Sequence, residues 1–296
     1  MARTTPARPV DVEALFPEVA GFRKSAVRLH PRAGDPSAQE SSLGGPVLWP
    51  PSQPWPYCED DHLSVAFPKP ENEPVPFVPV LQLFAADVPE LPFPAGTDLL
   101  QVAWCPFEHE HLYVPRPEIF WRDSSQGDLE PADPPRPSGA PGDYLPNPCV
   151  LHPERVIDYP SWDLPKDVHD ALEPRFRQLQ KEAGCSYQYH LSVSDGIKVG
   201  GYPTWTQDPH WPSCPACGER TEHLLTINSA EFDGSGQAWL AIEDTPATGT
   251  IWDLPYEERR RIQRAHGLMI GDMGGIYLFE CRRCPGRPFA YHSDSS

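Results

Sequence analysis

Residues Gly275–Pro285, which read GIYLFECRRCP, form the most informative stretch of this 296-residue chain. An earlier stretch, Gly96–Pro106, reads GTDLLQVAWCP and aligns with it without a gap, with Gly, Leu, Cys and Pro identical. Each contains the short apolar run of a buried strand and ends in a Cys-Pro turn. We therefore predict that one strand-and-turn unit occurs twice in the chain.

The residues before each stretch repeat as well. Gly44–Pro46 is followed by Trp55–Cys58, and Gly200–Pro203 is followed by Trp211–Cys214, so that Trp-Pro-x-Cys matches without a gap. An apolar run follows each motif, FVPVLQLF over 77–84 and HLLTIN over 223–228. Chance similarity is the alternative, because biased composition alone produces weak repeats.

Composition and repeat together predict the fold class. Proline makes up 40 of the 296 residues, against a typical share of about 5%, and it limits helix length and is kept out of central strands. We predict a β-rich α+β protein, with two internally duplicated repeats packed into one globular unit and few short helices. The expected division is a first repeat over 1–130, a proline-rich linker or loop over 131–150, and a second repeat over 151–296.

Local signals place the helices and strands. A helix is expected over 165–183, capped by Asp163 and ended by Gly184, a short one over 257–266, and a weaker one after Asp11. Strands are expected at 26–30, 78–84, 99–104, 111–114, 118–121, 188–193, 224–228, 237–242 and 276–280.

Four cysteines carry the clearest chemical signal. Cys214-Pro-Ala-Cys217 and Cys281-Arg-Arg-Cys284 are two Cys-x-x-Cys pairs in turn-forming surroundings, and four thiolates suffice for tetrahedral zinc. We predict one structural Zn²⁺ in the second repeat. A redox Cys-x-x-Cys and four ordinary thiols are the alternatives, and a catalytic zinc is disfavoured because four thiolates leave no open position.

The first repeat looks like a degenerate copy of this metal half. Cys58 aligns with Cys214 and Cys105 with Cys284, whereas Asp61 and Val102 stand where the other two cysteines would be. A second metal site would use Cys58, Cys105, His109 and His111, with His62 as a further contributor. Two core thiols with solvated histidines are the favoured interpretation of these residues.

Charge restricts the partners. The chain has 24 Lys and Arg against 42 Asp and Glu, a net charge of −18, which favours a basic protein client and disfavours RNA and anionic membranes. A small basic cluster beside the second cysteine pair is a possible RNA or partner contact, although its arginines can equally neutralise the acidic body. Its members are Arg282, Arg283, Arg287 and Trp211.

The location follows from two absences in the sequence. No stretch approaches the ~20 apolar residues of a membrane span, and residues 1–10 do not read as a secretory signal. We therefore expect a cytoplasmic protein with reduced cysteines and no membrane association.

Three motifs together resemble a known family. Lys198–Gln207 (KVGGYPTWTQ), Cys214-x-x-Cys217 and Gly274–Cys281 (GGIYLFEC) resemble the YwqG-like family of bacterial proteins of unknown function. They are also similar to the programmed-cell-death-protein-2 and ribosome-maturation zinc proteins. The resemblance implies a duplicated β-rich fold, zinc, and roles in escorting a ribosomal protein or in RNA processing. It implies no catalytic residues.

The sequence therefore favours a protein without enzymatic activity. Our leading hypothesis is a zinc-stabilised protein-binding module, such as an escort for a basic client like a ribosomal protein. The alternatives are an RNA-binding or RNA-processing factor that uses the basic zinc knuckle, and an immunity protein that neutralises a toxin. Client, substrate and oligomeric state are not encoded in any motif.

Overall fold

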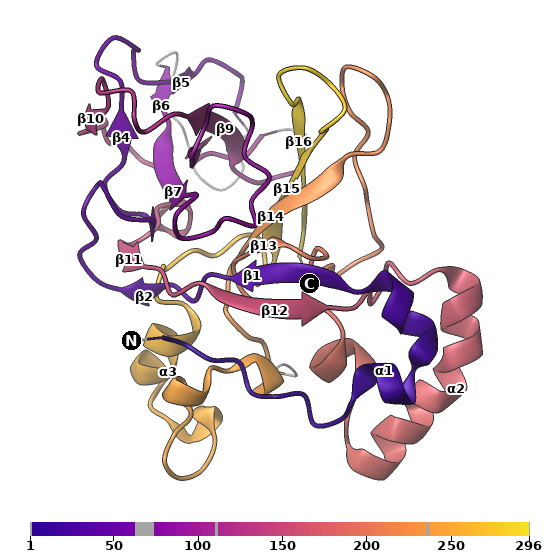
Figure 1. Cartoon of the computed structure of the whole chain (residues 1–296). Helices are drawn as coiled ribbons and strands as arrows, with labels where there is room; N and C mark the ends of the chain where they lie inside the picture. The colour runs from indigo at the N-terminus through magenta and orange to yellow at the C-terminus, as the bar shows by residue number, and fades with distance from the viewer. Residues whose placement is uncertain (1, 63–73, 110–111, 235–236, 296) are drawn as a thin grey trace.

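The computed structural model describes residues 2–62, 74–109, 112–234 and 237–295. Most of the regular structure is β-sheet, with few short helices around it (Figure 1). This confirms the predicted β-rich α+β class. No helix within these ranges is long and apolar enough to cross a membrane.

Within the described ranges, one six-stranded sheet has the order β12-β1-β13-β14-β15-β16, with neighbouring strands antiparallel. Its last three strands form a meander that the chain builds from consecutive apolar runs. The strands are β1 (Lys24–Arg28), β12 (Glu154–Asp158), β13 (Lys198–Gly200), β14 (Glu222–Asn228), β15 (Gly275–Glu280) and β16 (Phe289–Asp294).

The second six-stranded sheet has the order β2-β11-β3-β7-β8-β9. Two short pairs, β4 with β10 and β5 with β6, flank it. The strands of the sheet are β2 (Arg32–Ala33), β3 (Ser42–Leu43), β7 (Val78–Phe84), β8 (Leu99–Cys105), β9 (Arg116–Arg122) and β11 (Cys149–Val150), and those of the pairs are β4 (Leu48–Trp49), β10 (Glu130–Pro131), β5 (Tyr57–Cys58) and β6 (Val75–Pro76).

Four consecutive strands of each sheet have the same order, β3-β7-β8-β9 in one and β13-β14-β15-β16 in the other. In each sheet, a short strand that leads into a Gly-Gly pair is followed by a three-stranded meander. The pairing between the first two strands of each meander has one register shift. The shift lies between Pro79 and Leu81 in β7 and between His223 and Leu225 in β14. A duplication would produce this shared order, and the duplication itself stays a prediction.

Two strands pair with strands of another expected segment. β1, from the first segment, pairs with β12 and β13, whereas β11, from the end of the middle segment, pairs with β2 and β3. The division into 1–130, 131–150 and 151–296 stays a prediction about sequence units.

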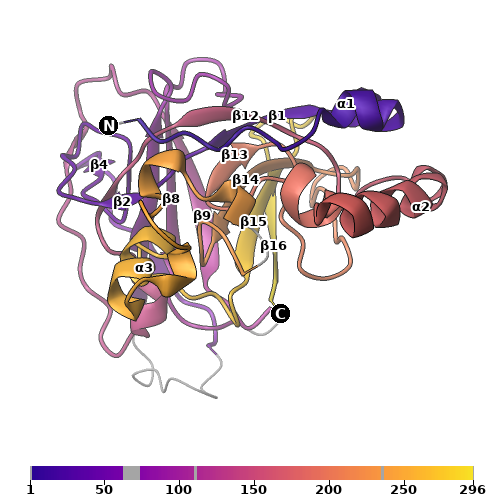
Figure 2. The same ribbon diagram turned by 90° about the horizontal axis from the view of Figure 1, so that it is seen from below.

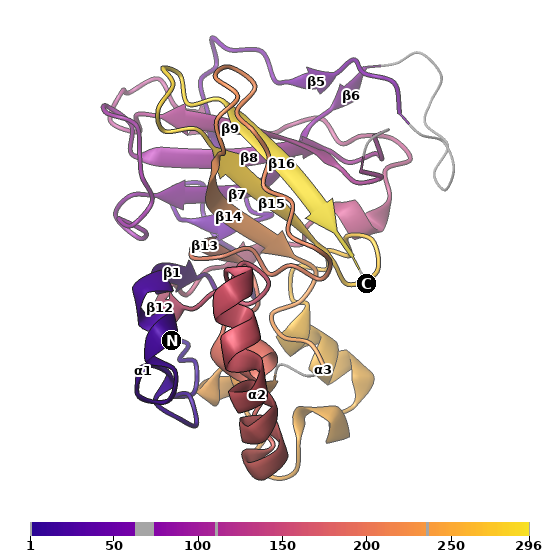
Figure 3. The same ribbon diagram turned by 90° about the vertical axis from the view of Figure 1, so that its right-hand side faces the viewer.

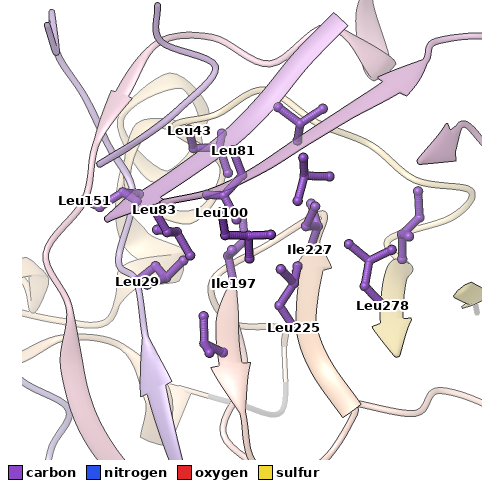
Figure 4. Close-up of a cluster of buried hydrophobic side chains, with 14 of the residues drawn as sticks. Leu29, Leu43, Leu81, Leu83, Leu100, Leu151, Ile197, Leu225, Ile227 and Leu278 are labelled. Carbon is purple, nitrogen blue, oxygen red and sulfur yellow. The ribbon is translucent and has the colours of Figure 1, made fainter. Parts of the chain in front are cut away.

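One hydrophobic core lies between the sheets. Leu81 and Leu100 from one sheet and Leu225 and Leu278 from the other are all buried in the same cluster (Figure 4). The meanders β7–β9 and β14–β16 lie as two layers over this core (Figure 3). The layers hold the ends of the strands, and the loops that leave them, in fixed positions.

The helices lie outside the sheets. α1 (Val12–Leu15) and α2 (Lys166–Ala183) lie side by side at one end, and α3 (Tyr256–Gln263) lies at the other (Figure 2). As predicted, Gly184 ends α2 in a left-handed conformation, with φ of 65°. Asp163 does not cap α2; instead its carboxylate accepts hydrogen bonds from the indole N–H groups of Trp205 and Trp211.

Two predicted strands are helical turns, which corrects the sequence analysis. Residues 188–193 fall mostly within a π-helical turn, Tyr187–Leu191, because Tyr187 stacks on Phe176 of α2 with ring centroids 4.1 Å apart. Residues 237–242 form parts of two 3-10 turns, Gln237–Trp239 and Ile242–Asp244. Of the strand expected at 111–114, residues 112–114 form a turn and residue 111 lies outside the described residues.

Candidate metal centres and a lined groove

The structure brings the four predicted cysteines together. The sulfur atoms of Cys214 and Cys284 lie 3.9 Å apart, and those of Cys217 and Cys281 lie 3.8 Å apart. All four sulfurs lie within 4.8 Å of one another. Two thiolates bound at ~2.3 Å to one tetrahedral zinc lie about 3.8 Å apart, so this group has the dimensions of a four-thiolate site.

Each cysteine pair is held by a tight turn. In the first, the Ala216 N–H lies 3.4 Å from the Cys214 sulfur, and Gly218, with φ of 74°, donates its N–H to the Cys214 carbonyl. In the second, Cys281 donates its N–H to the Pro288 carbonyl. The loop before β14 and the loop between β15 and β16 therefore meet beside each other (Figure 1).

The thiols of this group are electrostatically unlike one another. Burial raises the pKa of Cys214, but hydrogen bonds from the backbone amides of Cys217 and Ala216, together with those from the Cys281 and Cys217 thiols, bring the pKa down to about 7. A hydrogen bond with Cys217, together with burial, raises the pKa of Cys284 to about 12. Crowded thiolates repel one another, and a divalent cation among them removes that repulsion.

A second group of metal-ligand type forms in the other sheet. His62 Nε2 lies 3.0 Å from the Cys105 sulfur, and His109 Nε2 lies 3.3 Å from the Cys58 sulfur. The four ligand atoms lie within 4.8 Å of one another. Cys58 and Cys105 are fully buried and His109 is 8% exposed, so this histidine is not solvated as the favoured interpretation had it.

The sheet register corrects the alignment of the two cysteine-bearing halves. Leu81 pairs with Val102, and its counterpart Leu225 pairs with Leu278. Cys105 therefore corresponds to Cys281, not to Cys284. Of the predicted ligands, Cys58, Cys105 and His109 are brought together with the further contributor His62, while the structure does not describe His111.

The arginines of the basic cluster are paired with acids. Arg282 lies 3.0 Å from Glu222 and 2.7 Å from Glu280, Arg283 lies 3.1 Å from Glu219, and Arg287 lies 3.3 Å from Glu280. Each of these arginines therefore neutralises carboxylates of the chain itself.

Trp211, the aromatic member of that cluster, is also engaged within the chain. Its indole N–H donates to Asp163, and the Arg220 guanidinium lies 4.0 Å from its ring centroid. One face of the ring is therefore covered by a cation of the chain itself.

A groove beside α2 was not predicted. Two hollows of about 260 Å³ and 700 Å³ share Ser161, Trp162 and Gln188. Trp162 is 46% exposed and Tyr189, on the wall of the smaller hollow, is 42% exposed. The acidic and basic side chains that line the hollows are Asp195, Asp233, Asp170, Glu173 and Asp208, against Lys166 and Arg177.

One carboxyl of the groove has an unusual environment. Burial, followed by the negative charge of Asp233, raises the pKa of Asp195 to about 7. A cation placed next to such a buried carboxylate stabilises its ionised form more than it would stabilise that of a solvated carboxylate. No pattern in the sequence marks this groove, because α2 and the segments around 162, 195 and 233 meet only in the folded chain.

Comparisons with known proteins add no identity. No protein-family model matches this chain, and no curated protein matches it significantly. The resemblance to the YwqG-like family therefore stays a prediction.

Proposed function

We propose that this protein is a non-enzymatic binding module in which a structural zinc ion fixes the sheet that contains β14 and β15, and whose client is a basic protein, such as a ribosomal protein. The acidic, aromatic groove beside α2 is the observation that carries the client proposal. The four-cysteine group is the observation that carries the zinc proposal.

Zinc at the four cysteines would serve structure. Cys214 and Cys217 precede β14, and Cys281 and Cys284 follow β15, so one ion would join the two loops at the same end of the meander. Four thiolates complete a tetrahedral shell and leave no position for water or substrate. The softness of the donors favours zinc over hard cations such as Mg²⁺ and Ca²⁺.

The groove matches a basic segment chemically. Carboxylates outnumber Lys and Arg along its walls by five to two, and exposed Trp162 and Tyr189 offer ring faces to a guanidinium or ammonium group. The whole chain adds an excess of 18 acidic side chains, which attracts a cationic partner over long range.

Binding of RNA at the zinc knuckle is the weaker proposal. Arg282, Arg283 and Arg287 each lie within 3.3 Å of a glutamate. Their charge is thus largely compensated before any nucleic acid approaches, and phosphate binding depends on uncompensated basic groups.

Fluorescence anisotropy with a labelled ten-residue arginine-glycine peptide tests the client proposal. We expect binding that weakens with salt, and Trp162→Ala to weaken it at least about fivefold, because a cation–π contact contributes about 1 kcal/mol. Tyr57→Ala is the matched control, since Tyr57 is 45% exposed on β5, outside the groove.

Two results would contradict the proposal. One is equal affinity of the wild type and Trp162→Ala for the peptide. The other is tighter binding of a single-stranded RNA than of the peptide at the same ionic strength, which would favour the nucleic-acid alternative.

A further inference from the structure

We propose that Cys58, His62, Cys105 and His109 form a second zinc site, so that each of the two sheets carries one metal ion. This inference goes beyond the proposed function and does not depend on any client. It rests on the spacing of the ligands, the register of the strands, the distances between ligand atoms and the burial of the group.

The spacing of the ligands is the same on both sides of the site. Three residues separate Cys58 from His62, and three separate Cys105 from His109. In the other sheet the spacing is two residues, within Cys-x-x-Cys. The sheet with β7 and β8 therefore has two Cys-x-x-x-His knuckles where the sheet with β14 and β15 has two Cys-x-x-Cys knuckles.

The sheet register places these knuckles at corresponding positions. Cys105 is the last residue of β8, and Cys281 directly follows β15. Cys105 lies three residues after Val102, the partner of Leu81. Cys281 likewise lies three residues after Leu278, the partner of Leu225. Cys58 precedes β7 just as Cys214 precedes β14. A repeated fold thus presents metal-ligand side chains at the same ends of the same strands twice, although the residue types differ.

The distances between ligand atoms fit one ion after small adjustments. A thiolate and an imidazole nitrogen on a tetrahedral zinc lie about 3.6 Å apart. The observed separations of 3.3 Å and 3.0 Å are a few tenths of an ångström shorter. A hydrogen bond between thiol and imidazole explains such a separation too, so the alternative to a metal site is a pair of Cys–His hydrogen bonds.

Burial favours the metal. Cys58 and Cys105 are 0% exposed, and they lie in an apolar cluster with Val75, Phe77 and Phe107. Two thiols and two imidazoles are costly polar groups in such surroundings, and both imidazoles turn Nε2 toward the sulfurs. One divalent cation would satisfy all four groups at once, and Cys₂His₂ is a donor set that binds zinc.

Zinc analysis of the wild-type protein, purified without a tag, tests the inference. We expect two equivalents of zinc per chain. X-ray absorption should show an average shell of three sulfurs and one nitrogen per zinc, since four and two sulfur ligands are shared by two ions. One equivalent of zinc with four sulfur ligands would overturn the inference and leave the four-cysteine proposal intact. One equivalent with two sulfur and two nitrogen ligands would support the second site and contradict the four-cysteine proposal.

Variants assign the second equivalent. The double variant His62→Ala/His109→Ala should lose one equivalent and retain a four-sulfur shell, whereas the control His169→Ala/His210→Ala, which changes two exposed histidines, should retain two. Two equivalents in the first variant would overturn the inference. If that variant does not fold, the absorption spectrum of the wild type still decides the question.

Discussion

Gly201 lies directly against the carboxylate of Asp158. A Cβ atom on Gly201 would lie 2.2 Å from Asp158 Oδ2, and the glycine has φ of 65°. Asp158 is fully buried and accepts a hydrogen bond from the Tyr202 N–H, next along the chain. The second glycine of this Gly-Gly motif is therefore required by the close approach of the buried Asp158 carboxylate.

Gly201→Ala should destabilise the protein far more than Gly200→Ala. Both substitutions put a side chain on a left-handed residue, which costs about 1–2 kcal/mol. Only Gly201→Ala adds an overlap, because a Cβ on Gly200 would lie 3.2 Å from its nearest neighbour. We expect a loss of about 3 kcal/mol or more against about 1–2 kcal/mol in urea unfolding. Equal losses would show that Asp158 moves aside freely.

Lys198→Met should break the buried pair with Asp158. Lys198 and Asp158 are both 0% exposed, and Nζ lies 2.7 Å from the carboxylate. Removing the ammonium leaves a buried charge unpaired, which costs about 3–5 kcal/mol in unfolding free energy. The control is Lys166→Met, which removes an exposed pair with Asp170 and should cost under about 0.5 kcal/mol. A loss as small as that of the control would show that Asp158 is satisfied without Lys198.

Acid should destabilise the fold through His266. Its ring is 0% exposed, and burial, followed by the charges of Arg264 and Arg32, lowers its pKa to about 3. In the unfolded chain the pKa of His266 is near 6.5, so its imidazole binds a proton over a range of pH in which the folded protein keeps it neutral. The contribution of the neutral His266 side chain to the free energy of unfolding is therefore fully present above about pH 6.5, and it is lost as the pH falls from there toward 3.

His266→Asn measures this contribution. Asn can still accept the Leu268 N–H, which now donates to His266 Nδ1, but it does not titrate. Between pH 7.5 and 5.5 the wild type should lose about 1.4 kcal/mol more unfolding free energy than the variant. His169→Asn, on an exposed histidine, should follow the wild type. Parallel pH profiles for all three proteins would contradict a neutral, buried His266.

Apolar runs were sufficient to predict the central strands of the meanders. The strand expected at 78–84 is β7 itself, and those expected at 99–104 and 276–280 are β8 and β15 within one residue. β12 and β16 were missed, because their residues are only partly buried and mixed in character. The pairing of β1 with β12 and β13, and of β11 with β2 and β3, is long-range, and no local pattern encodes it.

The four-cysteine group was predictable because Cys-x-x-Cys is a local signal. The second group was only partly predicted, for two physical reasons. The ungapped alignment matched residue types along 96–106 and 275–285 without the strand register, which makes Val102 the counterpart of Leu278, so that Cys105 was assigned to the position of Cys284. The repeated Cys-x-x-x-His spacing, from Cys58 to His62 and from Cys105 to His109, was the signal that could have identified all four ligands.

Zinc content and thermal stability of Cys281→Ser test the central claim most directly. The account predicts the loss of one zinc equivalent and a melting temperature many degrees lower, because the binding free energy of a structural zinc, about 10 kcal/mol in small fingers, rivals the stability of a domain. Cys185→Ser, which changes a buried thiol outside both groups, should keep its zinc. Unchanged zinc content, or an unshifted melt of Cys281→Ser, would contradict a structural metal at Cys214, Cys217, Cys281 and Cys284.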